Sequence, residues 1–307
     1  MNNAAHADRP VLGVMLMLGF CAMAPLGDAS AKALGATMAL GQLLLIRFAI
    51  QAALLTPLIA VTGGTFRMTP RVLRLTLIRT VIHVVAIGMM FTALQYLPLA
   101  DAIAIAFVMP FIMLLLGRFF LNEEVGPRRI AACAVGFVGT LMVVQPSFAA
   151  VGAPALLPLG VAILFALFML VTRQMAKDVD PITLQAVSGV AATIGLGAAA
   201  LIFADWSFFA MKAPTGFEWT LLAAIGVLGT VAHLLMTWSL RFAPSATLAP
   251  MQYLEIPFAT IVGWAAFGDL PNGLAAIGIA VTVGAGLYII WRERATARAS
   301  AAAPPAA

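Results

Sequence analysis

The sequence predicts an all-α membrane protein that crosses the bilayer with ten transmembrane helices, arranged as two inverted five-helix repeats. Three observations support this fold class: the composition, a regular succession of apolar runs, and a likeness between the two halves. Of the 307 residues, 63% are hydrophobic and only 9% are Asp, Glu, Lys or Arg. A soluble domain is nearer half apolar and a quarter charged, so this chain has too little polar surface to cover a globule in water.

Long apolar runs follow one another along the chain, separated by short interruptions rich in Gly and Pro. A spanning helix needs about 20 apolar residues, so ten of them use roughly 200 residues. Backbone polar groups in lipid have no water to bond with, and each run is therefore expected to be a helix. The expected spans are residues 11–28, 39–62, 75–96, 99–121, 128–145, 154–174, 182–204, 218–240, 246–267 and 273–291.

The basic residues predict the orientation of the chain, because Lys and Arg are enriched in cytoplasmic loops. With a cytoplasmic N-terminus and ten spans, the opposite side receives only Lys32 and Lys212, while Arg47 and Arg79 lie inside runs. Both termini are thus expected in the cytoplasm, and residues 292–307 are expected to form a disordered tail there. The cytoplasmic side receives Arg9, Arg67, Arg71, Arg74, Arg118, Arg128, Arg129, Arg173, Lys177, Arg241, Arg292, Arg294 and Arg298.

The two halves of the chain resemble each other when one is shifted by 146 positions. Leu94, Tyr96, Pro98 and Ala100 then meet Leu240, Phe242, Pro244 and Ala246, and Glu123 meets Asp269. Two prolines inside runs, Pro110 and Pro257, correspond if one residue is inserted, and each should kink its helix. Five spans per half is an odd number, so the second half must enter the membrane from the opposite side. Inverted repeats of this kind are typical of alternating-access carriers.

Several motifs resemble the repeat unit of the EamA-type drug/metabolite transporter superfamily. The first half carries Tyr96-Leu97-Pro98-Leu99-Ala100-Asp101-Ala102, then Pro110-Phe111, then Leu121-Asn122-Glu123-Glu124 before a new helix. The second half holds a looser copy in Arg241-Phe242-Ala243-Pro244, Pro257 and Gly268-Asp269. The resemblance implies two EamA-type domains, residues 11–145 and 154–291. It also implies a central substrate cavity lined mainly by helices other than the fifth and tenth.

Other segments are similar to bacterial members of this family that carry riboflavin. These segments are Leu16–Cys21, Pro25–Asp28 and Ala106–Phe111. The resemblance implies a secondary transporter in the bacterial inner membrane, with riboflavin uptake as the most specific expectation. Relatives with the same repeat transport S-adenosylmethionine or export amino-acid-like metabolites, and the motifs do not separate these substrates.

Ionisable residues inside the runs are candidates for substrate binding, because a charge at the bilayer centre costs at least about 2.5–3.5 kcal/mol. Glu255 lies midway along the ninth run, with Gln252 on the same helical face and Pro257 freeing the carbonyl of Tyr253. Glu255 is expected to recognise substrate or to carry a coupling proton; the alternative is an ion pair with Arg47 or Arg79 that locks helices together.

The remaining candidates are basic, aromatic and amide side chains. Arg47 is either a site residue or a structural partner, while Arg79 is expected to extend to the cytoplasmic headgroups. His83 and His233 are expected to bind substrate or relay protons, or else to bond neighbouring helices. An aromatic solute needs a stacking face and amide groups, which Trp238, Tyr253, Phe107 and Gln95 offer.

Other protein classes fit the sequence less well. The chain has no nucleotide-binding loop, GxSxG or HExxH motif, so we expect no catalytic activity, although a membrane enzyme or a non-transporting sensor stays an alternative. The histidines lack Cys or acidic companions at ligand spacing, so neither a metal nor a cofactor is expected. The net charge of +5 follows the loop rule and indicates no nucleic-acid partner. Glycines in the fifth and tenth runs fit close packing or a homodimer: Gly136, Gly139, Gly278, Gly284 and Gly286.

Overall fold

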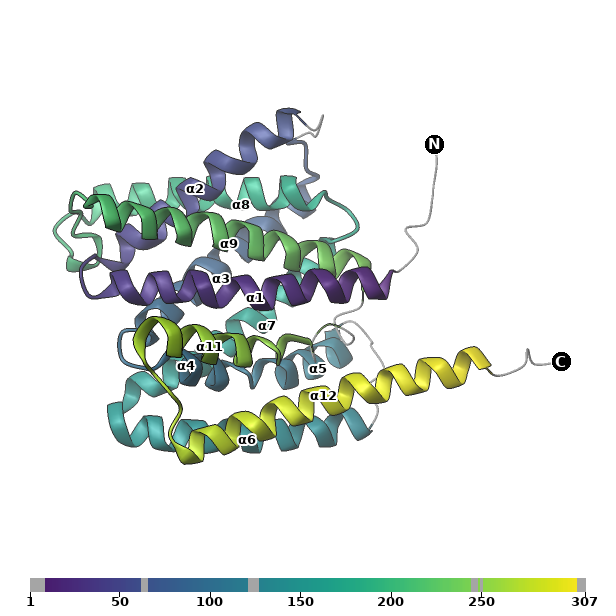
Figure 1. Cartoon of the computed structure of the whole chain (residues 1–307). Helices are drawn as coiled ribbons and strands as arrows, with labels where there is room; N and C mark the ends of the chain where they lie inside the picture. Colours follow the sequence, from purple (N-terminus) through teal and green to yellow (C-terminus); the bar gives the residue numbers. More distant parts are fainter. Residues whose placement is uncertain (1–8, 62–65, 121–126, 244–247, 249–250, 303–307) are drawn as a thin grey trace.

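The computed structural model describes residues 9–61, 66–120, 127–243, 248 and 251–302, and these residues are almost entirely helical (Figure 1). Each of the ten predicted spans contains a helix. The motif residues 121–124, Pro244 and Ala246 lie outside the described residues. The helices are α1 (Pro10–Gly35), α2 (Leu40–Val61), α3 (Pro70–Ala93), α4 (Leu99–Ala106), α5 (Met109–Phe120), α6 (Pro127–Val151), α7 (Leu157–Met175), α8 (Pro181–Ile202), α9 (Gly216–Phe242), α11 (Glu255–Phe267) and α12 (Gly273–Ala302), with short 3₁₀ turns η1 (Ala153–Leu156) and η2 (Ser207–Phe209).

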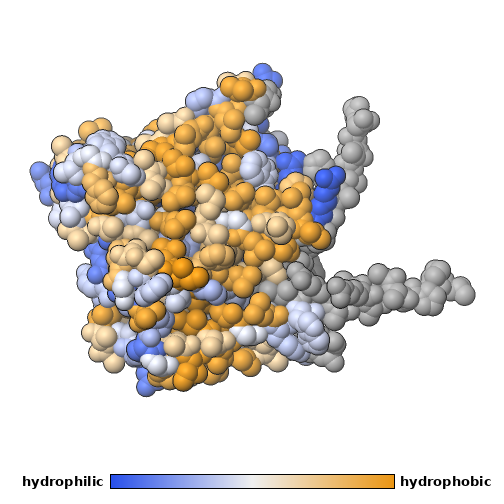
Figure 2. All heavy atoms as spheres, in the orientation of Figure 1, coloured by the Kyte–Doolittle hydropathy of each residue, from blue (hydrophilic) through white to orange (hydrophobic). Residues whose placement is uncertain are grey.

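Seven of the described helices are long and apolar enough to cross a bilayer: α1, α2, α3, α6, α7, α8 and α9. The other three spans are composite or shorter. They are α4 with the start of α5, the short helix α11, and the apolar Gly273–Tyr288 stretch of α12. Hydrophobic side chains cover the middle of the helices on the face shown in Figure 2, and hydrophilic residues gather towards the ends. This distribution matches a protein whose sides contact lipid.

The helix contacts follow a two-fold relation between the halves. The first span, α1, packs against the eighth, α9, and the third, α3, packs against the sixth, α7. Exchanging the halves converts one of these pairs into the other. The remaining large contacts join equivalent spans, α2 with α8 and α6 with α12. The described start of α1 and end of α12 lie at the same end of the bundle (Figure 1). The fold is therefore the inverted five-plus-five repeat predicted from the sequence.

The fourth span is a broken helix, and the ninth is interrupted at the corresponding depth. Helix α4 ends before Phe107 and α5 begins at Met109, while the chain turns at Tyr253 and Leu254 before α11. Proline explains both positions, because Pro110 cannot bond to the carbonyl four residues earlier, at Ala106, and Pro257 cannot bond to that of Tyr253. One detail differs from expectation: the carbonyl of Tyr253 is not left vacant, since it accepts the N–H of Ile256 at 3.3 Å.

The end of the chain differs from the prediction of a disordered tail at 292–307. Helix α12 continues to Ala302, and only residues 303–307 lie outside the described residues. Ala and Arg dominate this segment and have high helix propensities, so a helix that has left the apolar run continues. The prediction relied on polarity and overlooked propensity.

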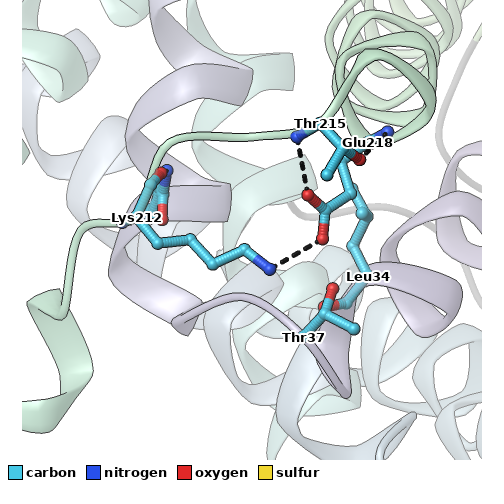
Figure 3. A network of polar contacts seen from close by, with 6 residues as sticks. Leu34, Thr37, Lys212, Thr215 and Glu218 are labelled. Carbon is cyan, nitrogen blue, oxygen red and sulfur yellow. Dashed lines mark hydrogen bonds and ion pairs between the residues drawn. The ribbon is translucent and has the colours of Figure 1, made fainter.

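Loops at the end of the bundle opposite the termini are held by a polar network. Glu218 accepts hydrogen bonds from the Lys212 ammonium and the Thr215 amide, each at 2.8 Å (Figure 3). The amide of Gln42 at the start of α2 donates to the Lys212 carbonyl at 2.7 Å. At the same end, Lys32 pairs with Asp269 at 2.7 Å. Both lysines that the sequence placed on this side are therefore neutralised by carboxylates.

The α6–α12 contact is close enough to require glycine. A Cβ on Gly278 would lie 2.5 Å from the carbonyl oxygen of Gly139, and a Cβ on Gly139 would lie 2.7 Å from that of Gly278. Thr282 also donates to the Gly136 carbonyl at 3.3 Å. These contacts assign Gly136, Gly139 and Gly278 to packing between two helices of one chain.

We therefore expect Gly278→Val to destabilise the protein. Overpacking costs about 1–3 kcal/mol, and here the obstacle is backbone that cannot move without separating the helices. The measurement is the apparent Tm of the purified protein in detergent. Gly284→Val is the matched control, because a Cβ on Gly284 meets nothing within 4 Å. Equal melting temperatures for the two variants would contradict this account of the contact.

Candidate functional site

A cavity of about 100 Å³ lies at the centre of the bundle, between helices from both halves. This space is large enough for several water molecules. Helices α1 to α4 and the start of α5 contribute from the first half, and α7, α9 and α11 from the second. Most of the wall is aliphatic or aromatic, including Phe20, Phe91, Phe107 and Phe165. The ionisable residues in the wall are Asp28, Arg47, His233 and Glu255.

The cavity occupies the half of the bundle that lies away from the chain ends. On α3, which begins at Pro70, the lining residues start only at Ala86, and on α7 they end by Phe165. The half nearer the chain ends is filled, because Met17, Phe168 and Met169 are fully buried there. In the predicted orientation, the cavity belongs to the outer half of the membrane and the cytoplasmic half is closed.

Glu255 lies in the cavity wall, as its sequence position suggested. It is the first residue of α11, directly after the interruption at Tyr253 and Leu254. Its carboxylate makes no ion pair or hydrogen bond with any described residue, so the predicted alternative of a pair with Arg47 or Arg79 is not what the structure shows. A carboxylate with no protein partner at this depth is free to meet a solute or a proton.

Asp28 is a cavity residue that sequence reasoning missed. The predicted first span, residues 11–28, ends at this position, so the sequence pattern makes Asp28 a boundary residue. Helix α1 instead continues to Gly35, so Asp28 lies about two turns inside it. The signal was present in the apolar residues that follow it as far as Leu40, interrupted only by Lys32 and a few small residues.

Arg47 contacts His233 at the side of the cavity. Its Nη2 lies 3.3 Å from Nδ1 of His233, which itself lies 2.9 Å from the carbonyl oxygen of Gly229. Because that carbonyl can only accept, Nδ1 carries the proton and is not an acceptor for Arg47. The Nη1 group of Arg47 has no partner among the described residues, although the side chain is only 3% exposed. The guanidinium therefore has a buried donor that no described residue satisfies.

His83 and Arg79 lie next to the Arg47–His233 pair, on its side away from the cavity. The rings of His83 and His233 lie 4.4 Å apart between centroids, and His83 stacks on Phe168 at the same separation. The guanidinium of Arg79 lies over the ring of the same Phe168, 4.2 Å from its centroid. Neither histidine ring has metal-ligating neighbours in groups of three or more within the described part of the chain.

Arg79 does not extend to the headgroups as predicted. It is fully buried and donates to Thr172 at 2.7 Å and to Ser188 at 2.9 Å. These hydroxyls come from α7 and α8, so the guanidinium bonds three helices together. The prediction was wrong because it considered distance along one helix, whereas facing helices supply acceptors and an aromatic face.

Four other candidates are not among the residues that line the cavity. Gln252 is buried beside the sulfur atoms of Met169 and Met17, and Tyr253 lies against Gly286 of α12. Trp238 packs with Leu55 and Ile59 nearer the chain ends. Gln95 is exposed in the turn before α4, beside Gly35. Of the predicted binding residues, the structure thus brings Glu255, Arg47 and His233 together at the cavity, with His83 behind them.

An inverted helical repeat around a central cavity with a few ionisable residues is typical of membrane transporters. Within this class, the profile of the EamA-like transporter family matches residues 11–145 and 153–292. The chain belongs to this family. It is a multi-pass membrane protein of a family of small-metabolite transporters, as the resemblance of its motifs indicated.

Several bacterial transporters are similar in sequence to this chain. A riboflavin transporter of Rhizobium johnstonii is 33% identical over 71% of this chain and 70% of its own length. A riboflavin transporter of Brucella anthropi is 27% identical over 82% of this chain and 88% of its own. An S-adenosylmethionine uptake transporter of Rickettsia bellii is 25% identical over 87% and 89%. One crystal structure matches 94% of this chain and the whole of its own chain, with a TM-score of 0.70 and 18% sequence identity. At this identity the match shows the fold alone.

Thr172→Val should lower the stability of the protein. The substitution removes the acceptor of the Arg79 Nε–H and leaves a buried charged donor unpaired, which costs about 1–3 kcal/mol. The measurement is the apparent Tm in detergent. Thr56→Val is the control with the same change of shape, because the Thr56 hydroxyl has no partner among the described residues. If the Thr172→Val and Thr56→Val proteins have the same apparent Tm, the hydrogen bond between Arg79 and Thr172 contributes nothing to stability.

Proposed function

We propose that this protein takes up riboflavin across the bacterial inner membrane as a secondary transporter that works by alternating access. The observation that carries the proposal is the central cavity, which both repeats line and where Arg47 presents an unpaired buried donor. The named relatives that carry riboflavin support the choice of substrate.

The chemistry of the wall suits a flat, carbonyl-rich ring system. Phe20 and Phe165 lie nearly parallel, at 21° with centroids 6.2 Å apart, and Phe107 is part of the same wall. Aromatic faces of this kind stack on an isoalloxazine ring. The pyrimidine edge of the flavin has two carbonyl acceptors and one N–H donor. Arg47 matches the acceptors, and the carboxylate of Asp28 or Glu255 matches the donor.

The cavity also supports a second substrate class. Asp28 and Glu255 are two carboxylates without protein hydrogen bonds among the described residues, and together with Arg47 they would suit a zwitterion such as S-adenosylmethionine or an amino-acid-like metabolite. In this alternative the protein imports, exports or exchanges such a metabolite. The same cavity serves both alternatives, so substrate competition separates them.

The two-fold relation of the halves supports alternating access. The cavity is confined to one half of the bundle while side chains fill the other half. Exchanging the roles of the two repeats produces the mirrored state, with the cavity facing the other compartment. We assign the filled half to the cytoplasm on the basis of the basic loops, which places both termini in the cytoplasm.

Arg47→Ala should impair riboflavin binding. Loss of charge-assisted hydrogen bonds of about 1.5–3 kcal/mol corresponds to a roughly 10- to 100-fold higher Kd. The measurement is the quenching of flavin fluorescence by purified protein, followed by growth rescue of a riboflavin-requiring strain. Arg67→Ala, at an exposed position before α3, is the control. Unchanged riboflavin affinity in Arg47→Ala would remove this residue from the site.

Gly229→Ala tests the same site without deleting a charge. A Cβ at this position would lie 3.1 Å from Nε and Nη2 of Arg47, so the guanidinium must shift. We expect weaker riboflavin binding with little change in Tm. Gly195→Ala is the matched helical control, because a Cβ there has nothing within 4 Å. If both glycine variants bind riboflavin like the wild type, the position of Arg47 does not matter for recognition.

A further inference from the structure

Two carboxylates from opposite halves of the chain share the cavity. Asp28 comes from α1 and Glu255 from α11, and these two helices pack against each other. Neither side chain forms an ion pair or a hydrogen bond with a described residue. Sequence reasoning identified only one of the two, so the pair emerges from the tertiary structure.

The surrounding groups do not neutralise both carboxylates. Arg47 of α2 is the guanidinium in the cavity wall, and His233 of α9 donates its Nδ1 proton to the Gly229 carbonyl. Asp101 of α4 accepts a hydrogen bond from Ser147 of α6 at 3.2 Å, on the side away from the cavity. The helices packed around the pair, α2, α3, α4 and α9 together with α1 and α11 themselves, carry other titratable or charged groups that do not line the cavity in the described part of the chain: Cys21, Lys32, Arg71, Arg74, Arg79, His83, Glu218 and Arg241.

Electrostatics sets how many charges this cavity holds when it closes. A charge without a counter-ion in an apolar, water-free site is costly, and the group takes up or loses a proton instead. Two carboxylates in one site resist ionising together for the same reason. With one guanidinium facing two carboxylates, the neutral arrangement contains one ionised and one protonated carboxyl group.

We propose that Asp28 and Glu255 form a one-proton site, so that one proton enters with each molecule of a neutral substrate. This inference rests on the proposed function and adds its coupling ion. An open or substrate-free cavity contains water that can screen an extra negative charge, whereas a cavity occluded around the substrate does not. The carrier therefore closes around a neutral substrate only after the carboxyl pair has bound a proton. On the cytoplasmic side, the proton leaves with the substrate and water refills the site. The empty carrier holds this water in place of the substrate, so it returns without the proton.

A cationic substrate changes this requirement. The positive charge of S-adenosylmethionine balances the second carboxylate, so no proton is needed for closure. The same pair of residues therefore predicts proton-coupled uptake of a neutral flavin and uptake of a cation that a pH gradient does not stimulate. This difference links the coupling to the charge of the substrate.

The test uses the full chain reconstituted into liposomes that contain a pH-sensitive dye, with radiolabelled riboflavin outside. An outside pH one unit lower than inside should drive up to about tenfold accumulation by the wild type, with acidification of the lumen. Glu255→Gln and Asp28→Asn should equilibrate riboflavin without accumulation and without proton entry. Riboflavin counterflow at equal pH moves no net proton, so in both variants it should fall far less than accumulation, because the amide oxygen of Gln or Asn still accepts the flavin N–H.

Matched controls protect this test from folding artefacts. Asp205→Asn removes an exposed carboxylate in the turn after α8, outside the cavity, and should accumulate riboflavin like the wild type. Glu255→Asp and Asp28→Glu keep a carboxyl group and should recover part of the accumulation. Monodisperse elution and flavin-binding measurements establish that each variant is folded before transport is compared.

Each outcome decides between the two proposals. Wild-type protein that equilibrates riboflavin with no proton entry overturns the coupling and leaves the proposed function intact. Proton-driven accumulation that survives in both neutral variants overturns the assignment to these carboxylates. Wild-type protein that neither binds nor moves riboflavin overturns the proposed substrate. In that case S-adenosylmethionine transport stimulated by an acidic exterior would overturn the one-proton site as well, and unstimulated transport would support it.

Discussion

Unsatisfied backbone polar groups are the constraint on which this structure depends. In a bilayer, each N–H and C=O group needs a partner within the protein. Nearly all described residues outside the loops are therefore helical. Departures from helix are tolerated only where the backbone is enclosed by protein. The two interruptions at Phe107–Val108 and Tyr253–Leu254 satisfy this condition, because they lie at corresponding depths inside the bundle. The second interruption brings Glu255 into the cavity wall at the first turn of α11.

The charged side chains inside the bundle occupy two kinds of place: the packed contacts between helices and the wall of the cavity. Arg79 is bonded by hydroxyl groups and covers an aromatic ring, which makes it part of the packing between α3, α7 and α8. Arg47, Asp28 and Glu255 instead lie in the cavity wall with donors or acceptors left free among the described residues. The two arginines looked alike in the sequence. Each has one buried nitrogen without a partner among the described residues, Nη1 of Arg47 and Nη2 of Arg79, so position separates them: Arg47 lines the cavity and Arg79 does not.

The fold was largely predictable, because its signals are local. Apolar runs of the right length, proline at the breaks and a shift of 146 positions between the halves were enough to predict ten spans and their inversion. The prediction failed where two local signals competed. Residues 292–302 are polar enough for a tail but have the helix propensity to extend α12, and Asp28 looked like the end of a span that continues for two more turns.

The candidate site was only partly predictable. Glu255, Arg47 and His233 were recognised because an ionisable side chain inside an apolar run is costly and needs a reason. Gln252 and Tyr253 are neighbours of Glu255 along the chain, yet they lie in packed regions between helices. The chain turns at Tyr253 and Leu254, so a spacing of three residues no longer places Gln252 and Glu255 on one helical face.

The sequence by itself determined the membrane environment, the number of spans and the inverted repeat, since these depend on hydrophobicity, length and order along one chain. Only the tertiary structure decided which polar groups share the cavity. That outcome depends on which faces of α1, α2, α9 and α11 turn towards one another, and helix packing sets those faces through contacts between residues more than 200 positions apart, such as Cys21 and Met251.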